Sequence, residues 1–380
     1  MKVALVHDWL NQMGGAENVL IALKELFPDA PLYTSIYDRA RMPAIMRGWE
    51  IHTSSLDRIP GIYRNHQAAL PLYPFAWEQF DFSAYDVVLS NKSGFCHGII
   101  TPPQTLHLCY CLTPTRYLWS TEGYLQREGV GRLRRTLLPP VLTALRLWDQ
   151  NAAQRVDRFA AISRAVQQRI DKFYGADSTI IYPPVDTHRF LPGERKDYFF
   201  IVSRLIPYKR IDLAVEAFSR LGLPLVIAGD GRDRAALEAT AGPTVRFLGR
   251  VSDEELHRWM GGARAFLFPG EEDFGIAPLE AASAGVPVIA YAAGGALDTV
   301  IDGDTGLFFH EPTAASLAEA VRRFETMTFD RERIRAHALQ FDVAAFKRQI
   351  YRWVEAEHIA HQARLSRPHP FAQKDPYGTA

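Results

Sequence analysis

The fold of this chain is decided by residues 269–280, which read PGEEDFGIAPLE. They follow a short apolar run, 265–268, that is typical of a buried strand, and they lead into a helical pattern over 276–284. Glu272 and Glu280 flank the predicted helix start, with seven residues between them. Helix N-termini bind phosphate through free N–H groups, and carboxylates accept hydrogen bonds from sugar and ribose hydroxyls. The stretch therefore predicts a phosphate site with a hydroxyl-binding carboxylate on each side.

The same alternation of strand and helix extends over the whole C-terminal half of the chain. Short apolar runs that end in Gly, Pro, Asn or Asp predict strands, and a 3.6-residue period between them predicts helices. Strands are expected at 198–202, 225–228, 245–248, 265–268, 288–291 and 307–309, and helices at 211–221, 232–239, 253–260, 276–284 and 314–324. Strands separated by helices are typical of a parallel sheet.

The N-terminal half repeats this order less regularly. Its strands are expected at 2–7, 32–37, 86–90, 106–112 and 158–162. Consecutive prolines near Tyr182 predict a junction between the halves, and Pro139-Pro140 predicts an interruption of any single long helix there. We therefore predict an α/β fold of two doubly wound domains. Open α/β sheets bind ligands at the carboxyl ends of their strands, so the site is expected between the two domains.

Composition narrows the class of protein. The chain has 380 residues, 47% hydrophobic and 23% charged, which excludes a disordered chain or a coiled coil and predicts two domains. Lys and Arg number 43 and Asp and Glu also number 43, so no basic field indicates a nucleic-acid partner. Three cysteines cannot form a disulfide framework, and the first residues do not resemble a secretory signal. We therefore expect a cytoplasmic protein.

Two further loops carry residues suited to phosphate. Gly14-Gly15 follows the first predicted strand and opens a helix, where it forms either a phosphate site or only a tight turn. Arg204 and Lys209 follow the strand at 198–202, where they form either a clamp for a diphosphate or a solvated basic loop. Asp302-Gly303-Asp304 matches a metal-binding pattern but lies among glycines, so we expect a turn and no metal.

Taken together, these motifs resemble the family-4 retaining glycosyltransferases of GT-B fold. The resemblance covers nearly the whole chain in the family's order and is most specific over 269–306. It rests on Gly14-Gly15-Ala16-Glu17, Ser163, Pro184-Val185-Asp186, Arg204 with Lys209, Gly229-Asp230-Gly231, Phe247-Leu248-Gly249, Glu272 with Glu280, and Asp302-Gly303 with Thr305-Gly306. Residues 113–119, TPTRYLW, look like those of bacterial enzymes of surface-polysaccharide assembly, many of them mannosyltransferases.

The resemblance implies a GT-B fold, with two doubly wound Rossmann-like domains facing a central cleft. Residues 1–182 would form the acceptor side and 183–345 the nucleotide-sugar donor side. A helix over 346–365 would pack back on the N-terminal domain, and 366–380 would be a loose tail.

The resemblance also implies roles for individual residues. Arg204 and Lys209 would hold the donor diphosphate, and Glu272 would contact a hydroxyl of the transferred sugar; these three are the expected catalytic residues. The expected donor-binding residues are Gly14, Gly15, Gly231, Arg250, Val251, Asp273, Phe274, Gly275, Ile276 and Glu280. Relatives often carry a histidine where this chain has Leu112, so its role cannot be transferred. The acceptor-side candidates are His97, His107, Arg116 and Tyr117.

The function implied is transfer of a sugar, with retention and without a metal or other cofactor, from a GDP-mannose-like or UDP-sugar donor to a hydroxyl of a glycan or lipid-linked acceptor. The alternative is a catalytically silent nucleotide-sugar-binding or assembly scaffold of the same fold. Arginines and leucines interleave over Arg127–Arg146, which indicates either contact with the anionic inner face of the cell membrane or a solvated helix face.

Overall fold

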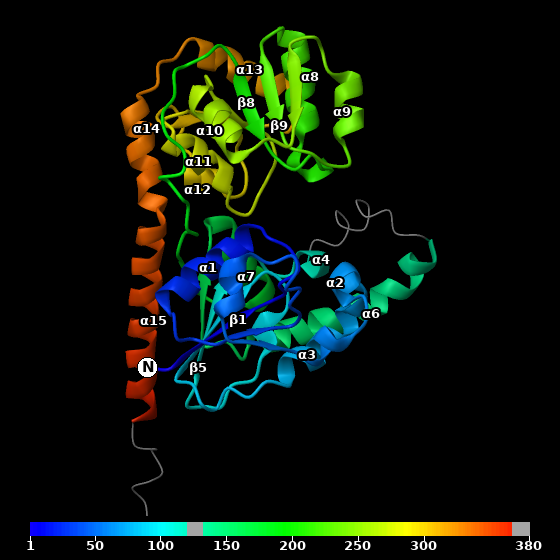
Figure 1. Ribbon diagram of the computed structural model, residues 1–380, viewed down its shortest axis with the longest axis vertical. Coiled ribbons are helices and arrows are strands. Elements are labelled where there is room, and N and C mark those ends of the chain that lie inside the picture. The colour runs from blue at the N-terminus through cyan, green and yellow to red at the C-terminus, as the bar shows by residue number, and fades with distance from the viewer. Residues whose placement is uncertain (120–131, 367–380) are drawn as a thin grey trace, which may run out of the picture. The chain divides into compact units, whose positions relative to one another are not determined.

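The computed structural model describes residues 1–119 and 132–366, with the side chains of 132–138 left aside (Figure 1). Two compact units divide this chain. One comprises residues 1–111, 140–159 and 348–366, and the other comprises 112–119, 132–139 and 160–347. Each unit is assembled from separate stretches of sequence, and the domain boundaries expected from the sequence stay a prediction.

The first sheet has seven strands in the order β3-β2-β1-β4-β5-β6-β7. They are β1 (Val3–His7), β2 (Leu32–Thr34), β3 (Ile51–Thr53), β4 (Val87–Lys92), β5 (Leu106–Cys111), β6 (Arg158–Ala161) and β7 (Ser178–Ile180). The pairings of β1 with β2 and β4, of β2 with β3 and of β4 with β5 are all parallel. The order runs outward in opposite directions from β1 and β4, so their carboxyl ends mark the switch point at which open α/β sheets bind ligands.

The helices of the first half are α1 (Gly15–Leu26), α2 (Ile62–Asn65), α3 (Tyr73–Glu78), α4 (Arg116–Trp119), α6 (Arg132–Ala153) and α7 (Arg164–Tyr174). Short 3-10 turns lie at η1 (Ala44–Gly48), η2 (Ser55–Arg58), η3 (His66–Leu72) and η4 (Cys96–Gly98). Helix α7 shows why such a segment forms where it does. Ser163 caps its first turn by accepting from the amide of Val166, and Gly175 ends it in the left-handed conformation.

The second sheet has six strands in the order β10-β9-β8-β11-β12-β13. They are β8 (Phe199–Val202), β9 (Leu225–Ala228), β10 (Val245–Gly249), β11 (Phe266–Phe268), β12 (Val288–Tyr291) and β13 (Gly306–Phe309), and all their pairings are parallel. Successive side chains of a strand face opposite sides of its sheet. Phe199 and Ile201 accordingly belong to one buried cluster and Phe200 to another, so both faces of this sheet are covered.

The helices of the second half are α8 (Ile211–Leu221), α9 (Arg234–Thr240), α10 (Asp253–Gly262), α11 (Ile276–Ser283), α12 (Ala296–Thr299), α13 (Ala314–Glu325), α14 (Arg331–Ala338) and α15 (Val343–Leu365), with 3-10 turns η5 (Pro207–Lys209) and η6 (Leu339–Phe341). Figure 1 shows α8 and α9 beside β8 and β9. Ser252 and Glu255 form a reciprocal capping box at the start of α10. In the first unit, α15 is tied by His361, which contacts the Gln104 carbonyl at 3.3 Å, and by an ion pair of Glu357 with Arg158.

The predicted elements are largely confirmed, with one clear exception. Strands β9 and β12 and helix α8 have the predicted bounds, and the other predicted strands differ mainly at their ends. The expected interruption at Pro139-Pro140 is wrong, because α6 runs without a break from Arg132 to Ala153. Its second half is held by tertiary packing. Leu142 and Leu145 are buried, and the Trp148 ring lies so close to Gly98 that a Cβ there would approach it to 2.1 Å.

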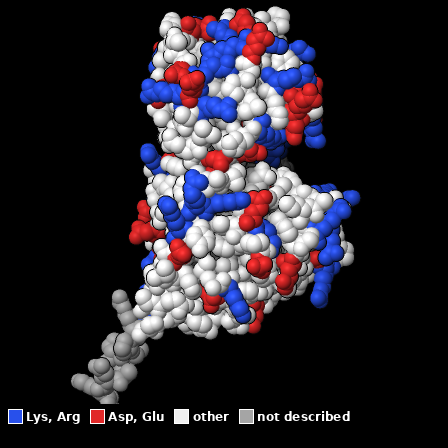
Figure 2. Space-filling model, turned by 60° about the vertical axis from the view of Figure 1, so that its left-hand side comes forward, with Lys and Arg blue, Asp and Glu red and all other residues white. Residues whose placement is uncertain are grey.

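The basic stretch Arg127–Arg146 lies partly outside the described residues: Arg127 is outside them, and the side chains of Arg132, Arg134 and Arg135 in α6 are left aside. In the part of the chain that is described, no helix combines the length and apolar character needed to cross a membrane. Acidic and basic side chains are mixed on the face shown in Figure 2. This mixture agrees with the zero net charge of the sequence.

Candidate functional site

Residues predicted to bind the donor come from the ends of four neighbouring strands. In the order β10-β9-β8-β11, Arg250-Val251 follow β10, Gly231 follows β9, Arg204 follows β8 and Glu272 follows β11. The strands are parallel, so all these loops leave the same edge of the sheet. This is the edge at which open α/β sheets bind ligands. The topology therefore gathers residues that are up to 68 positions apart in the sequence.

At this edge, Lys209 and Glu272 form an ion pair. The ammonium Nζ of Lys209, the last residue of η5, donates to Oε1 of Glu272 in the loop after β11. Their side chains are 15% and 23% exposed, so the pair is shielded but still reachable from solvent. Arg210, directly after Lys209, has a left-handed backbone with φ of 50°, which ends η5 abruptly before α8.

Arg204 lies close to the same pair. Its Nη2 donates to the hydroxyl of Tyr208 at 3.0 Å, and the Lys209 ammonium lies 5.3 Å from the centre of the Tyr208 ring. Tyr208 thus contacts both cations. Two cations that approach from different directions match the charge of a diphosphate.

The loop that carries Glu272 is fixed by a close approach of two main chains. The amide of Gly295 donates to the Glu272 carbonyl at 2.8 Å, and a Cβ added to Gly294 would lie 2.3 Å from that carbonyl oxygen. Only glycine fits there, because Gly294 also has a φ of 59°. After the loop, Gly275 adopts a φ of 89° and begins α11. The first amides of α11 then have no partners within the helix, as an anion site requires.

Glu280 lies one turn into α11. Its Oε1 is 3.9 Å from Nη1 of Arg189, and Nη2 of Arg189 donates to Asp253 at 2.7 Å. Burial raises the pKa of Glu280, Arg189 opposes this shift, and Asp186 and Asp253 add to it. Sequence reasoning missed Arg189, because its partners are 64 and more positions away along the chain.

The loops after β9 and β10 form the remaining wall. A Cβ on Gly231 would come within 2.2 Å of the Leu205 carbonyl oxygen, so the β9 loop packs directly on the β8 loop. Arg250 is 88% exposed, and its Nε lies 3.9 Å from Asp230. Val251 is half-buried beside it.

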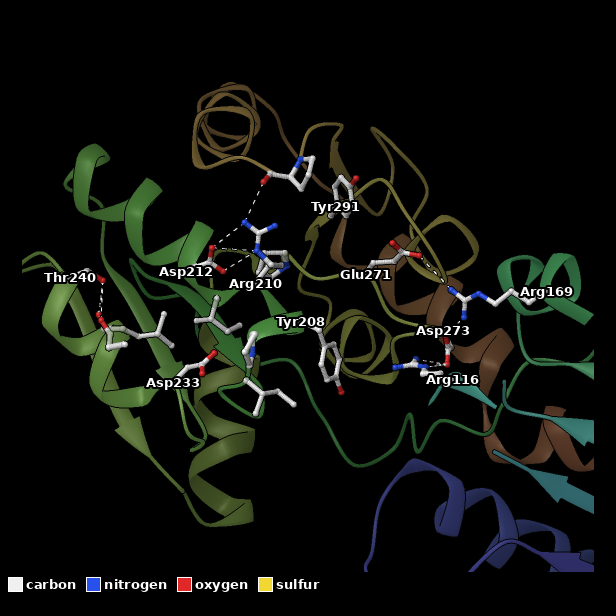
Figure 3. A pocket seen from close by; sticks show the side chains of 17 residues that line it. Arg116, Arg169, Tyr208, Arg210, Asp212, Asp233, Thr240, Glu271, Asp273 and Tyr291 are labelled. Atoms are coloured by element: carbon white, nitrogen blue, oxygen red, sulfur yellow. Dashed lines mark hydrogen bonds and ion pairs between the residues drawn. The ribbon is translucent and has the colours of Figure 1, made fainter. Parts of the chain in front are cut away.

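Asp273 is surrounded by cations. Its Oδ2 accepts from Nε of Arg116 at 3.0 Å and pairs with Nη2 of the same residue, while Oδ1 accepts from Nη1 of Arg169. The main-chain oxygen of Asp273 accepts from the Ser163 hydroxyl at 2.5 Å. Arg169 also lies 3.5 Å from Glu271. Figure 3 shows both guanidinium groups converging on this carboxylate. The sequence predicted Asp273 as a donor-binding residue, and its carboxylate is engaged within the protein.

A cavity of about 870 Å³ adjoins these residues. Arg116, Arg169, Glu271 and Asp273 lie at one end, while Asp233 and Thr240 of the α9 region lie at the other (Figure 3). Tyr208 and Tyr291 lie between the two ends in the same view. The volume of this cavity is within the ordinary range for small-molecule sites.

The remaining predicted residues belong to strand β5 of the first sheet or to segments that follow strands β1, β4 and β5. Gly14 precedes α1 in an extended conformation, and Gly15 is the first residue of that helix. Tyr117 is half-buried in α4.

His97 and His107 are fully buried. Burial lowers the pKa of His107 to about 3, with Arg155 adding to it, and burial together with Lys92 lowers the pKa of His97. Neither histidine can contact an acceptor without rearrangement of the core.

A carboxylate at the switch point of the first sheet was not predicted. Asp8 directly follows β1 and accepts from four consecutive main-chain amides, those of residues 93–96, at 2.6–2.7 Å. It therefore shapes the turn after β4. Its place directly after a buried strand was the signal that could have indicated it.

No cluster of three metal-binding side chains occurs within residues 1–119 and 132–366. The residues of the Asp302-Gly303-Asp304 pattern take part in a turn. Asp302 accepts from the amide of Phe308 at 3.0 Å, and Asp304 pairs with Arg333 at 3.1 Å.

Residues 186–341 match the family described as glycosyl transferases group 1. The matched region contains Arg204, Lys209, Glu272 and Glu280. A D-inositol 3-phosphate glycosyltransferase from Nocardioides sp. is 27% identical over 255 residues, which are 56% of this chain and 54% of that protein. A GDP-mannose-dependent alpha-mannosyltransferase from Mycolicibacterium smegmatis is 34% identical over 198 residues, 49% of this chain and 50% of its own length. The chain thus spans about half the length of these relatives.

Solved structures agree on the fold over a longer range. HepE from Anabaena, in complex with UDP and glucose, has a TM-score of 0.68 at 19% identity and covers 93% of this chain and 99% of its own. A similarity at this identity shows the fold, which is the GT-B fold with its two Rossmann-like parallel sheets.

Proposed function

We propose that this protein is a retaining glycosyltransferase that takes a nucleotide-diphosphate sugar as donor. The observation that carries the proposal is the Lys209–Glu272 ion pair beside Arg204 at the carboxyl edge of the second sheet, within the region that matches the group 1 family. A diphosphate could replace Glu272 as the partner of Lys209, which would release the carboxylate to accept from a sugar hydroxyl. One donor molecule would therefore satisfy both members of the pair.

The reaction follows from these roles. The acceptor oxygen bonds to the anomeric carbon on the face from which the diphosphate leaves, and the bond from that carbon to the β-phosphate oxygen breaks. The acceptor proton passes to the leaving phosphate oxygen. Arg204, Lys209 and the N-terminus of α11 stabilise the charge that grows on the diphosphate, and the protein's own cations make a donor-bound metal unnecessary. Glu280 holds the ribose, while Gly231, Arg250 and Val251 form the wall beside the base.

The acceptor is a glycan or lipid-linked hydroxyl in cell-surface polysaccharide assembly, and the donor is GDP-mannose or a UDP-sugar. The mannosyltransferase among the relatives supports GDP-mannose, and UDP in HepE supports the alternative base. Gly14 and Gly15 complete the phosphate site, and Arg116 and Tyr117 lie on the acceptor side. The protein works in the cytoplasm, and Arg127–Arg146 contacts the anionic inner face of the membrane. Binding to anionic vesicles that weakens with salt would support this contact, whereas equal binding to neutral vesicles would contradict it.

The test is a panel of GDP-mannose, UDP-glucose and UDP-galactose. Stabilisation against heat identifies the donor, because a ligand at ~100 times its dissociation constant adds ~2.7 kcal/mol. Release of nucleoside diphosphate, with or without an added glycan acceptor, then reports turnover. Stabilisation without any turnover would favour the alternative, a nucleotide-sugar-binding scaffold. Neither stabilisation nor turnover with any donor would contradict the proposed function.

A further inference from the structure

Asp273, the residue after Glu272, binds the guanidinium of Arg116. The Arg116 side chain is 44% exposed, and its guanidinium reaches Asp273, which is largely buried, through two nitrogens. Burial disfavours the charge of Arg116, but Asp273 favours it, as do Tyr208 and Glu272 to a smaller extent, and the pKa of Arg116 is raised. Arg116 therefore interacts with both neighbouring carboxylates. Asp273 holds it by hydrogen bonds, and Glu272 attracts it from further away.

Glu272 has partners of its own for both its side chain and its main chain. Its carboxylate is bound to Lys209, and its carbonyl is bound by the amide of Gly295 at 2.8 Å. The side chains of Glu272 and Asp273 thus have separate cationic partners, Lys209 for the first and Arg116 with Arg169 for the second. Figure 3 shows the partners of Asp273. A guanidinium can bind a carboxylate through two hydrogen bonds, so Arg116 would compete well for Glu272 if it were released.

We propose that Asp273 is a positioning residue that keeps Arg116 away from Glu272, so that Glu272 remains available to Lys209 and to the donor sugar. This role rests on the proposed function for its effect on turnover, but the change in pairing is a property of the free protein. An acid that only anchored the loop would act through Arg169 as much as through Arg116. The two roles therefore differ in what removal of Arg116 does.

The test compares Asp273→Asn, Arg116→Gln, the double variant and Arg169→Gln with the wild type. The first readout needs no ligand. It is the rate at which an N-hydroxysuccinimide ester acetylates Lys209, measured by mass spectrometry of the peptide. Asp273→Asn should raise this rate several-fold, because Lys209 loses its partner to Arg116. The double variant should return to the wild-type rate, and Arg169→Gln should leave it unchanged.

The second readout is hydrolysis of GDP-mannose or UDP-glucose. In this reaction a water oxygen bonds to the anomeric carbon, the bond from that carbon to the phosphate oxygen breaks, and the water proton passes to the diphosphate. Asp273→Asn should lower kcat about tenfold or more, with a smaller change in KM for the donor, and removal of Arg116 should restore part of the loss.

The outcomes separate the two proposals. Wild-type protein that hydrolyses neither donor and is stabilised by neither would contradict the proposed function, and the labelling of Lys209 would then decide the role of Asp273 alone. Unchanged labelling in Asp273→Asn, or a rise that Arg116→Gln does not reverse, would overturn that role. If Asp273→Asn does not fold, Arg116→Gln is compared with the double variant. Faster labelling of Lys209 in the double variant would also overturn the proposed role of Asp273.

Discussion

Nη1 of Arg189 lies 3.9 Å from Oε1 of Glu280, and this is the only cation that forms an ion pair with that carboxylate among the described residues. The distance exceeds that of a hydrogen bond, while burial raises the pKa of Glu280. The charge of Glu280 is thus only partly compensated within the protein, as expected of a carboxylate that accepts hydrogen bonds from the hydroxyls of a ligand.

The first prediction concerns stability and pH. The folded-state pKa of Glu280 lies above its ordinary value of 4.5, so folding favours the neutral form. That contribution is fully present below pH 4.5 and is lost as pH rises through the folded-state pKa. Glu280→Gln, which is always neutral, should therefore melt at a higher temperature than the wild type at pH 7, and the difference should shrink toward pH 4.5. Thermal unfolding followed by circular dichroism measures it, and a lower melting temperature at pH 7 would contradict it.

The same variant should bind the nucleotide less well. Loss of an ionised acceptor for ribose hydroxyls is expected to weaken binding of the free nucleoside diphosphate by about tenfold. Its effect on turnover should appear mainly in KM for the donor, because ribose does not react. Isothermal titration gives the affinity, and an unchanged dissociation constant would remove Glu280 from the proposed site.

Glu272→Gln should show the opposite pattern. Glu272 is proposed to contact the transferred sugar, where a hydrogen bond fixes the anomeric carbon against the acceptor, so its loss should lower kcat more than affinity. Free nucleoside diphosphate should bind this variant nearly as well as it binds the wild type. If nucleotide binding fell while kcat held, the two glutamates would have exchanged roles.

Removal of either cation should slow the reaction without unfolding the protein. Arg204→Ala or Lys209→Ala deletes a charge-assisted hydrogen bond to the diphosphate, worth roughly 1.5–3 kcal/mol, or about one to two decades in kcat/KM. Arg220→Ala is the matched control, since Arg220 forms a surface ion pair with Glu216 within α8. Normal turnover by both test variants would show that the diphosphate binds elsewhere.

Gly294, which packs against the main chain of Glu272, offers a test of loop geometry. Gly294→Ala would place a Cβ 2.3 Å from the Glu272 carbonyl oxygen, and it should reduce both stability and kcat. Gly222→Ala is the control, because Gly222 has a similar φ of 69° and open space around it. The control should cost only ~1–2 kcal/mol of stability and should leave kcat unchanged. Equal kcat values in the two variants would show that the position of this loop does not limit turnover.

The sequence predicted well those parts of the fold that depend on long apolar runs. It missed β3 and β7, which have three residues each and are mostly half-buried, so neither gives a clear alternation. The sequence-based prediction also overestimated the helix-breaking effect of Pro139-Pro140. The loss of two amide donors was outweighed by packing of α6, which no local pattern reveals.

For the candidate site, the loops were predicted but their partners were not. Glu272 and Glu280 stand out by their spacing, and Arg204 and Lys209 by their place after a strand. Arg169, Arg189 and Tyr208 have no such signal. Their roles come from side chains brought together from up to 104 positions apart, as for Arg169 with Asp273.

The interleaving of the two units affects synthesis of the chain on the ribosome. The first unit comprises residues 1–111 and 140–159, but also 348–366, to which His361 and Glu357 belong. At ~5–20 residues per second, this last part is made roughly 10–50 s after Cys111. The surface around Gln104 stays uncovered for that time, and the surface around Arg158 stays uncovered from its own synthesis until then. A nascent chain of this protein therefore presents an incomplete first unit to chaperones and proteases until helix α15 emerges.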